Sequence, residues 1–123
     1  MLFRSNKDLD KAQEMSYKTV QAEPDNVTYL DTYAWILFLK GKYAEAKIYM
    51  DKIVAYYDKE PQTDKEKENR ESINGGVLEH AGDIYFHCEE PDKALEYWKK
   101  ASQLDGASDL LEQKIKQKKY IAP

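Results

Sequence analysis

The sequence predicts an all-α fold in which helices pack in pairs along the chain. Apolar residues recur with helical spacing, and similar segments recur along the sequence. No stretch shows the strict polar–apolar alternation of a half-buried strand. With 123 residues, 41% of them hydrophobic, the chain is long enough to bury the core of one small domain but not of two.

Composition and charge exclude several functional classes. Nineteen basic and 23 acidic residues leave a net charge of only −4, so disorder driven by charge repulsion is not expected. The acidic isoelectric point, about 5.2, argues against nucleic acid as the main partner. The longest apolar run, Tyr33 to Leu39, is too short to span a membrane, and the lone Cys88 allows no internal disulfide.

Three segments of similar sequence set the predicted order of the helices. Residues 9–24, 43–58 and 91–106 each have alanine in fourth place: Ala12, Ala46 and Ala94. Ala12 and Ala46 lie 34 residues apart, and Ala46 and Ala94 lie 48 apart. The stretches 29–42 and 77–90 also match each other at a spacing of 48. We therefore expect a partial repeat at 1–26 and whole repeats at 27–58 and 75–106.

Turn and cap residues mark the boundaries of these elements. The first helix ends at Glu23-Pro24-Asp25-Asn26, which also offers caps for the next helix. A turn at Gly41 separates a helix at Val27–Lys40 from one at Tyr43–Tyr57. In the later repeat, Pro91 suits a first helical position and Gly106 ends the helix.

A strongly charged insertion separates the two whole repeats at residues 58–74. Two structures are compatible with it. The capping-box pattern Thr63-x-x-Glu66 would start an extra solvated helix from Asp64 to Ile73, and the alternative is a mobile loop. We favour the helix because segments rich in Glu and Lys propagate helices well.

The two ends of the predicted array differ. Ser108 can cap a final helix at 108–119, which would cover the last repeat with Leu110, Leu111 and Ile115. The solvated face of that helix would carry its lysines: Lys114, Lys116, Lys118 and Lys119. At the other end, Leu2 and Phe3 have nothing local to cover them. This predicts either a fragment of a longer array or a homo-oligomer formed through the N-terminal edge.

The pattern of large, small and aromatic residues resembles the tetratricopeptide repeat family, a 34-residue helix–turn–helix unit. The first whole repeat matches at Leu30, Tyr33, Ala34, Leu37, Ala46 and Met50, and the second at Leu78, Ala81, Gly82, Tyr85, Ala94 and Trp98. The chain also resembles the C-terminal repeats of larger bacterial members. The resemblance implies a superhelix whose first helices line a concave groove. Small residues such as Gly82 would lie where paired helices approach closely.

The resemblance also implies which residues face the groove. They are Thr28, Asp31, Trp35, Phe38 and Leu39 in one repeat, and Gly76, Glu79, Asp83, Phe86 and His87 in the next. Some family members clamp acidic chain ends with basic groove residues, and here the charge is reversed. We therefore expect a protein partner with an apolar or basic peptide segment, read by Trp35 and Phe38 with the acids on the rim. The alternative is that both aromatics belong to the core.

Catalytic patterns are weak. No phosphate-binding loop or CxxC pair is present, and the adjacent His87 and Cys88 point about 100° apart on a helix, so Cys88 is expected to be a buried structural thiol. Glu79, Asp83 and His87 have the spacing of a weak metal site, or of a polar strip with a local Asp83–His87 hydrogen bond.

The sequence therefore predicts a non-catalytic protein–protein interaction scaffold without a cofactor. A self-assembly module is the main alternative, and a metal-dependent enzyme using the Glu79 strip is a distant third. The chain as it stands is typical of a cytoplasmic protein, and a periplasmic location fits if it was cut from a longer exported precursor.

Overall fold

The computed structural model describes residues 6–123, and over that range the chain is entirely helical apart from turns and connections. The expectations placed on Leu2 and Phe3 lie outside the described residues. Seven helices follow one another, so the prediction of an all-α fold is confirmed: α1 (Asn6–Ala22), α2 (Val27–Leu39), α3 (Tyr43–Asp58), α4 (Asp64–Glu71), α5 (Gly75–His87), α6 (Pro91–Ala101) and α7 (Leu111–Gln117).

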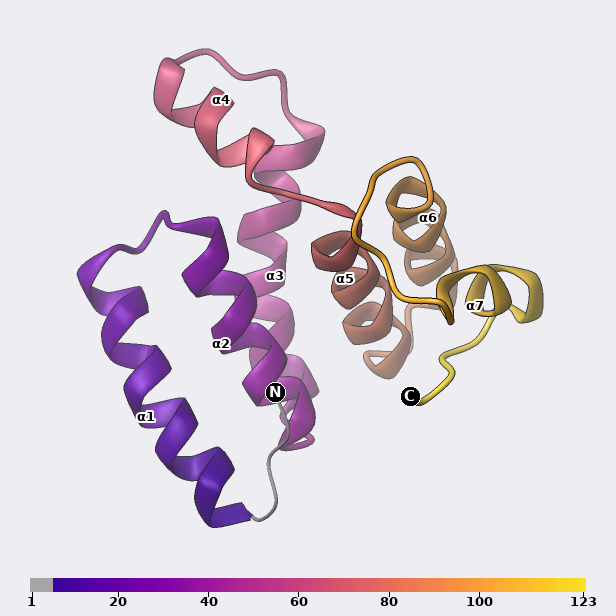
Figure 1. The fold of residues 1–123 in the computed structure, drawn as a ribbon, viewed down its shortest axis with the longest axis horizontal. Helices are drawn as coiled ribbons and strands as arrows, with labels where there is room; N and C mark the ends of the chain where they lie inside the picture. Colours follow the sequence, from indigo (N-terminus) through magenta and orange to yellow (C-terminus); the bar gives the residue numbers. More distant parts are fainter. Residues whose placement is uncertain (1–5) are drawn as a thin grey trace.

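Neighbouring helices pack in pairs. Helix α2 packs against α3, and α5 packs against α6, as the sequence predicts (Figure 1). Helix α1 packs against α2. Helix α3 packs against α5 and so joins the two pairs. The turn between α2 and α3 takes only three residues because Gly41 adopts a φ of 77°, which a side chain would disfavour.

Side-chain caps fix where several helices begin. The side chains of Asn26 and Asn74 accept the backbone N–H groups of Tyr29 and Val77, each at 3.0 Å, at the starts of α2 and α5. These bonds satisfy N–H groups that have no partner inside the first turn of a helix. Pro91 takes the first position of α6, where its missing N–H costs nothing.

Small residues occur where the paired helices approach. Ala34, Ala46 and Ala94 are fully buried. Gly82 on α5 lies under the indole of Trp98 on α6, and a Cβ added at Gly82 would be only 2.2 Å from Trp98 Cδ1. The contact between α5 and α6 therefore depends on the absence of a side chain at Gly82.

The charged insertion contains a helix, the first of the two alternatives that the sequence allowed. Thr63 caps α4, and its hydroxyl accepts the N–H of Glu66 at 3.1 Å, as the capping-box pattern indicates. The insertion is not wholly solvated, because Asn69 and Ile73 are buried. Arg70 ties it to the end of α3 by donating from Nε to the carbonyl oxygen of Tyr57 at 3.0 Å.

The C-terminal part departs from the sequence-based expectations in two respects. Helix α6 ends at Ala101 rather than at Gly106, which lies in the connection with a φ of 105°. Ser108 is not the residue next to the first turn of α7. Its hydroxyl accepts the Leu110 N–H at 3.2 Å and donates to Glu79 on α5 at 2.6 Å.

Candidate functional site

The predicted groove is divided into two parts by the C-terminal helix. Helix α7 and the chain after it cover α5, so Glu79 and Asp83 are only 4% and 2% exposed. Within residues 6–123, the surface that α1 and α2 form together is left open. The expectation that Glu79 and Asp83 stand on the rim of an open groove must therefore be corrected.

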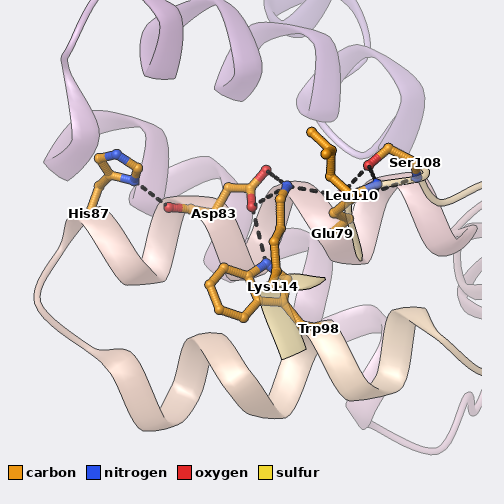
Figure 2. Close-up of polar contacts among 7 residues, drawn as sticks. All are labelled: Glu79, Asp83, His87, Trp98, Ser108, Leu110 and Lys114. Atoms are coloured by element: carbon orange, nitrogen blue, oxygen red, sulfur yellow. Dashed lines mark hydrogen bonds and ion pairs between the residues drawn. The ribbon is translucent and has the colours of Figure 1, made fainter. Parts of the chain in front are cut away.

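One lysine of α7 pairs with both buried carboxylates. Lys114 of α7, expected on the solvated face of its helix, is 4% exposed. Its Nζ lies 2.8 Å from Glu79 Oε2 and 2.9 Å from Asp83 Oδ1 (Figure 2). The lysine is buried because both carboxylates of α5 point at it, and together they supply the charge that a buried ammonium requires.

Further donors complete the shell around the two carboxylates. Ser108 donates from its backbone N–H to Glu79 Oε1 at 2.7 Å and from its hydroxyl to Oε2 (Figure 2). Trp98 donates its indole N–H to Asp83 Oδ1 at 3.1 Å. We call Glu79, Asp83, Trp98, Ser108 and Lys114 the lysine cluster. It binds α7 and the preceding connection to α5.

The two carboxyl groups respond differently to this environment. Burial by itself would raise the pKa of Glu79, but the hydrogen bonds from Lys114 and Ser108 outweigh it and lower the pKa. Burial dominates at Asp83 and raises its pKa, although the nearby Lys114 charge and the Trp98 hydrogen bond oppose the shift. The charge of the carboxylates raises the pKa of Lys114 in spite of its burial. The lysine is therefore a cation at neutral pH.

The weak metal site suggested by the spacing of Glu79, Asp83 and His87 is not assembled. The Asp83 carboxylate binds Lys114, and His87 Nδ1 lies 2.8 Å from the backbone oxygen of Asp83, not from its carboxylate. Within residues 6–123, no cluster of three or more His, Cys, Asp or Glu side chains has an arrangement that could hold a metal ion.

The structure partly decides whether the two aromatic groove residues, Trp35 and Phe38, belong to the core or to the surface. Phe38 is buried and contacts His87, at 4.9 Å between ring centroids, and Tyr120 of the C-terminal tail. It therefore belongs to the core. Trp35 is half-buried and stacks between Phe38, at 4.4 Å, and His80, at 3.9 Å.

An open groove lies between α1 and α2 and is closed at one side by His80 of α5. Its volume is about 650 Å³. Thr28, Asp31 and Trp35 line it as predicted, so three of the expected groove residues do lie together. The full lining is Ala12, Met15, Ser16, Thr19, Thr28, Tyr29, Asp31, Thr32, Trp35, Ile36 and His80. We call this surface the α1–α2 groove.

The remaining predicted groove residues lie elsewhere. Phe86 and His87 are half-buried near the end of α5, with their rings 5.9 Å apart. Gly76 borders a smaller cavity of about 270 Å³ between α5 and the C-terminal tail, which Trp35 and Lys114 also line. Cys88 is half-buried and contacts the carbonyl oxygen of Tyr43 at 3.4 Å, and burial raises the pKa of its thiol.

Sequence reasoning missed the α1 side of the groove. Met15 is 62% exposed and Ser16 is 8% exposed, and both line the groove from α1. A signal was present in the repeat alignment, where Ser16 replaces the large residue usual at that place. A small residue at that place leaves space beside α1 that a large side chain would fill.

Comparison with known proteins adds no further assignment. A scan against protein-family models and a search among curated proteins each found no match. No helix within residues 6–123 combines the length and the apolar character needed to cross a bilayer.

Proposed function

We propose that the protein is a non-catalytic interaction scaffold that binds an apolar segment of a partner protein in the α1–α2 groove. One observation carries the proposal. The groove is concave and measures about 650 Å³, and its lining includes the exposed apolar side chain of Met15 and the ring of Trp35. A concave apolar surface with a few polar side chains is typical of peptide-binding and ligand-binding sites.

The charges favour an apolar ligand over the basic one that the sequence also allowed. Asp31 already pairs with His80 Nδ1 at 2.9 Å. Glu79 and Asp83 share Lys114 inside the lysine cluster. A basic peptide would have to displace these partners, whereas an apolar segment would need only to cover Met15 and Trp35.

We infer a helical-repeat architecture of the tetratricopeptide type as the scaffold. The tight α2–α3 turn, the α5–α6 pair and the close contact at Gly82 agree with that family's pattern of small residues. Covering of the last pair by α7 is consistent with the role of a terminal cap in such arrays.

A peptide-display selection against the immobilised protein tests the proposal. Met15→Glu introduces a charge into the groove, and Ile48→Glu, at an equally exposed position on α3, is the matched control. Selected peptides should bind the parent and the Ile48 variant and lose at least tenfold in affinity for the Met15 variant, about 1.4 kcal/mol. Peptides that bind all three proteins equally would place the binding surface elsewhere.

Self-assembly is the second candidate function. Met15 and Tyr17 are exposed on α1, the first helix within the described residues, and could pack against a second copy. Light scattering over a range of concentrations separates the candidates. A dimer that Met15→Glu dissociates would support assembly, whereas a monomer at all concentrations would exclude it.

A further inference from the structure

We propose that residues 107–123 form a displaceable latch on α5, and that a partner segment carrying a lysine and an aromatic residue takes its place. The latch covers a surface that we call the α5 face, made of Glu79, Asp83 and His87 of α5 with Phe38 of α2. This site is separate from the α1–α2 groove, so the inference goes beyond the proposed function.

The latch itself shows which side chains the α5 face recognises. Lys114 donates to Glu79 Oε2 at 2.8 Å and to Asp83 Oδ1 and Oδ2 at 2.9 and 3.1 Å (Figure 2). Six residues later, the ring of Tyr120 contacts that of His87, with 4.7 Å between the centroids. The site therefore takes a cation and, six residues further along, an aromatic ring.

A similar polar contact joins the preceding helices. At the spacing of 48 residues, Glu79 of α5 corresponds to Asp31 of α2. His80 Nδ1 of α5 lies 2.9 Å from the Asp31 carboxylate, as Lys114 of α7 lies close to that of Glu79. In both repeats a carboxylate at this place meets a basic side chain of the element packed on it. The contact thus belongs to the helix face and not to α7 alone.

The latch is held mainly by polar side chains. Within residues 107–123, Leu111 is the only apolar side chain that is buried. Helix α7 has seven residues, and isolated helices shorter than roughly 12 residues are marginal in water. The segment therefore keeps its structure through its contacts with the rest of the fold. Its release costs less free energy than separation of the paired helices, which bury most of the core.

The latch also fills the α5 face incompletely. A cavity of about 270 Å³ lies between it and α5, and its lining includes Glu79, Asp83, Lys114 and Tyr120. Well-packed protein interiors contain few voids larger than a water molecule. Lys118, which turns the chain from α7 toward Tyr120, has a φ of 55°, a backbone conformation that side chains disfavour. Loose packing and a strained turn both favour exchange of this segment.

Exchange preserves the interactions of the α5 face. Release of the latch breaks the hydrogen bonds of Lys114 and exposes Leu111. A partner segment with the same three side chains remakes these contacts in kind. The pattern read from Leu111, Lys114 and Tyr120 is an apolar residue at position i, lysine at i+3 and an aromatic residue at i+9. The negative charge of Glu79 and Asp83 in the released state favours such a basic segment over an acidic one.

The test supplies the latch as a separate molecule. The probe is a fluorescently labelled synthetic peptide with the sequence of residues 107–123. The protein is the full chain, as the parent and as the variants Lys114→Ala and Tyr120→Ala, whose own latch lacks the cation or the ring. Two control peptides carry alanine in place of Lys114 or of Lys116, which is exposed on the same helix. Anisotropy measures affinity, and thermal unfolding followed by circular dichroism measures stability.

We expect the probe to bind both variants at least tenfold more tightly than the parent, because their own latch competes less well. It should also raise the unfolding temperature of the Lys114→Ala protein, since its lysine replaces the missing cation and binding stabilises the folded state. The control peptide without Lys116 should do the same, and the one without Lys114 should do neither. The Tyr120→Ala protein keeps Lys114 between the carboxylates, so it tests exchange even where Lys114→Ala prevents folding.

A further peptide tests the chemistry proposed for the partner. It keeps leucine, lysine and tyrosine at the places of Leu111, Lys114 and Tyr120 in an otherwise unrelated polar sequence, and it should bind the variants as the probe does. If only the probe binds, recognition depends on the rest of the segment and the partner pattern is wrong.

Other outcomes overturn the inference as a whole. If the probe binds none of the proteins, or if the peptide without Lys114 binds equally well, the latch is not exchanged on the α5 face. If the parent forms dimers that Lys114→Ala dissociates, the latch is exchanged between copies and the inferred partner is wrong. Peptides selected for the α1–α2 groove are judged by Met15→Glu, so the proposed function and this inference fail separately.

Discussion

The substitution Gly82→Ala tests the packing of α5 on α6 most directly. The Cβ of alanine would lie 2.2 Å from Trp98 Cδ1 and 2.3 Å from Trp98 Nε1, far inside van der Waals contact. The indole is fully buried, and buried side chains are close-packed. Either the helices move apart or the ring shifts and loses its 3.1 Å bond to Asp83.

The expected loss follows from three contributions. Overpacking of a well-packed core costs about 1–3 kcal/mol. Loss of a hydrogen bond to a charged acceptor costs about 1.5–3 kcal/mol, where it occurs. Alanine is a better helix former than glycine by about 1 kcal/mol, which acts in the opposite direction. We expect a net destabilisation of about 2–4 kcal/mol, a large part of the stability of a small domain.

Urea unfolding followed by circular dichroism measures this loss. The control is the same substitution in a Trp98→Leu background, where the added methyl group no longer meets the indole. There Gly82→Ala should cost much less or even stabilise the protein, and the difference between the two effects is the coupling energy. A single Gly82→Ala variant as stable as the parent would refute the assigned contact between α5 and α6.

Two further predictions concern the lysine cluster and are also measured by urea unfolding. Lys114→Ala leaves Glu79 and Asp83 buried without their cation and should cost about 3–5 kcal/mol, whereas Lys116→Ala, at an exposed position on the same helix, should change stability by less than about 0.5 kcal/mol. Folding lowers the pKa of Glu79. The ionised Glu79 side chain therefore stabilises the folded protein fully above the ordinary pKa of 4.5, and this stabilisation disappears as the pH falls through the lower pKa of the folded state. Glu79→Gln should therefore reduce the fall in stability below about pH 4.5, and an unchanged acid dependence would contradict the lowered pKa.

The helices and their pairing could be predicted from local sequence because each depends on signals within one or two turns. The spacing of Leu30, Tyr33, Ala34 and Leu37 specifies the buried face of α2 before any tertiary contact is known. Thr63 with Glu66 predicts the start of α4 for the same reason. Gly82 could be identified as a close-contact position because the repeat pattern requires a small residue there.

The lysine cluster could not be predicted in this way. Lys114 lies three residues after Leu111 and so on the same helix face, which separates it from the exposed Lys116, but this spacing does not show which carboxylates would pair with a buried lysine. It is buried because Glu79 and Asp83, 35 and 31 residues earlier in the sequence, face it across the α5–α7 contact. The burial of a charge depends on partners distant in sequence, which hydrophobic periodicity does not report.

The sequence places the end of α6 too late, at Gly106 instead of Ala101, for a related reason. The sequence from Ala101 to Gly106 is compatible with a helix that continues to the glycine. Instead the connection turns toward the start of α5, where the Gly75 N–H donates to the Asp105 carbonyl oxygen at 2.7 Å. A Cβ at Gly75 would lie 3.0 Å from three carbonyl oxygens of this segment, including those of Ala101 and Leu104. Glycine at position 75 lets the connection pack closely against the start of α5. Helix α6 ends at Ala101, where the chain turns toward this contact.

Within residues 6–123, the two ends of the row of packed helices differ in what covers them. At the C-terminal end, the acidic pair on α5 is neutralised by Lys114 of the same chain, and removal of α7 would expose two buried carboxylates. Water would solvate the separated charges, so the cost of opening that end comes from the lost hydrogen bonds of Lys114 and from the exposure of the buried Leu111. At the N-terminal side of residues 6–123, the corresponding surface on α2 carries Asp31 and Trp35, and α1 adds Met15. Covering this surface would break no ion pair and would remove apolar area from water, which is why we propose the α1–α2 groove as the place where a partner binds.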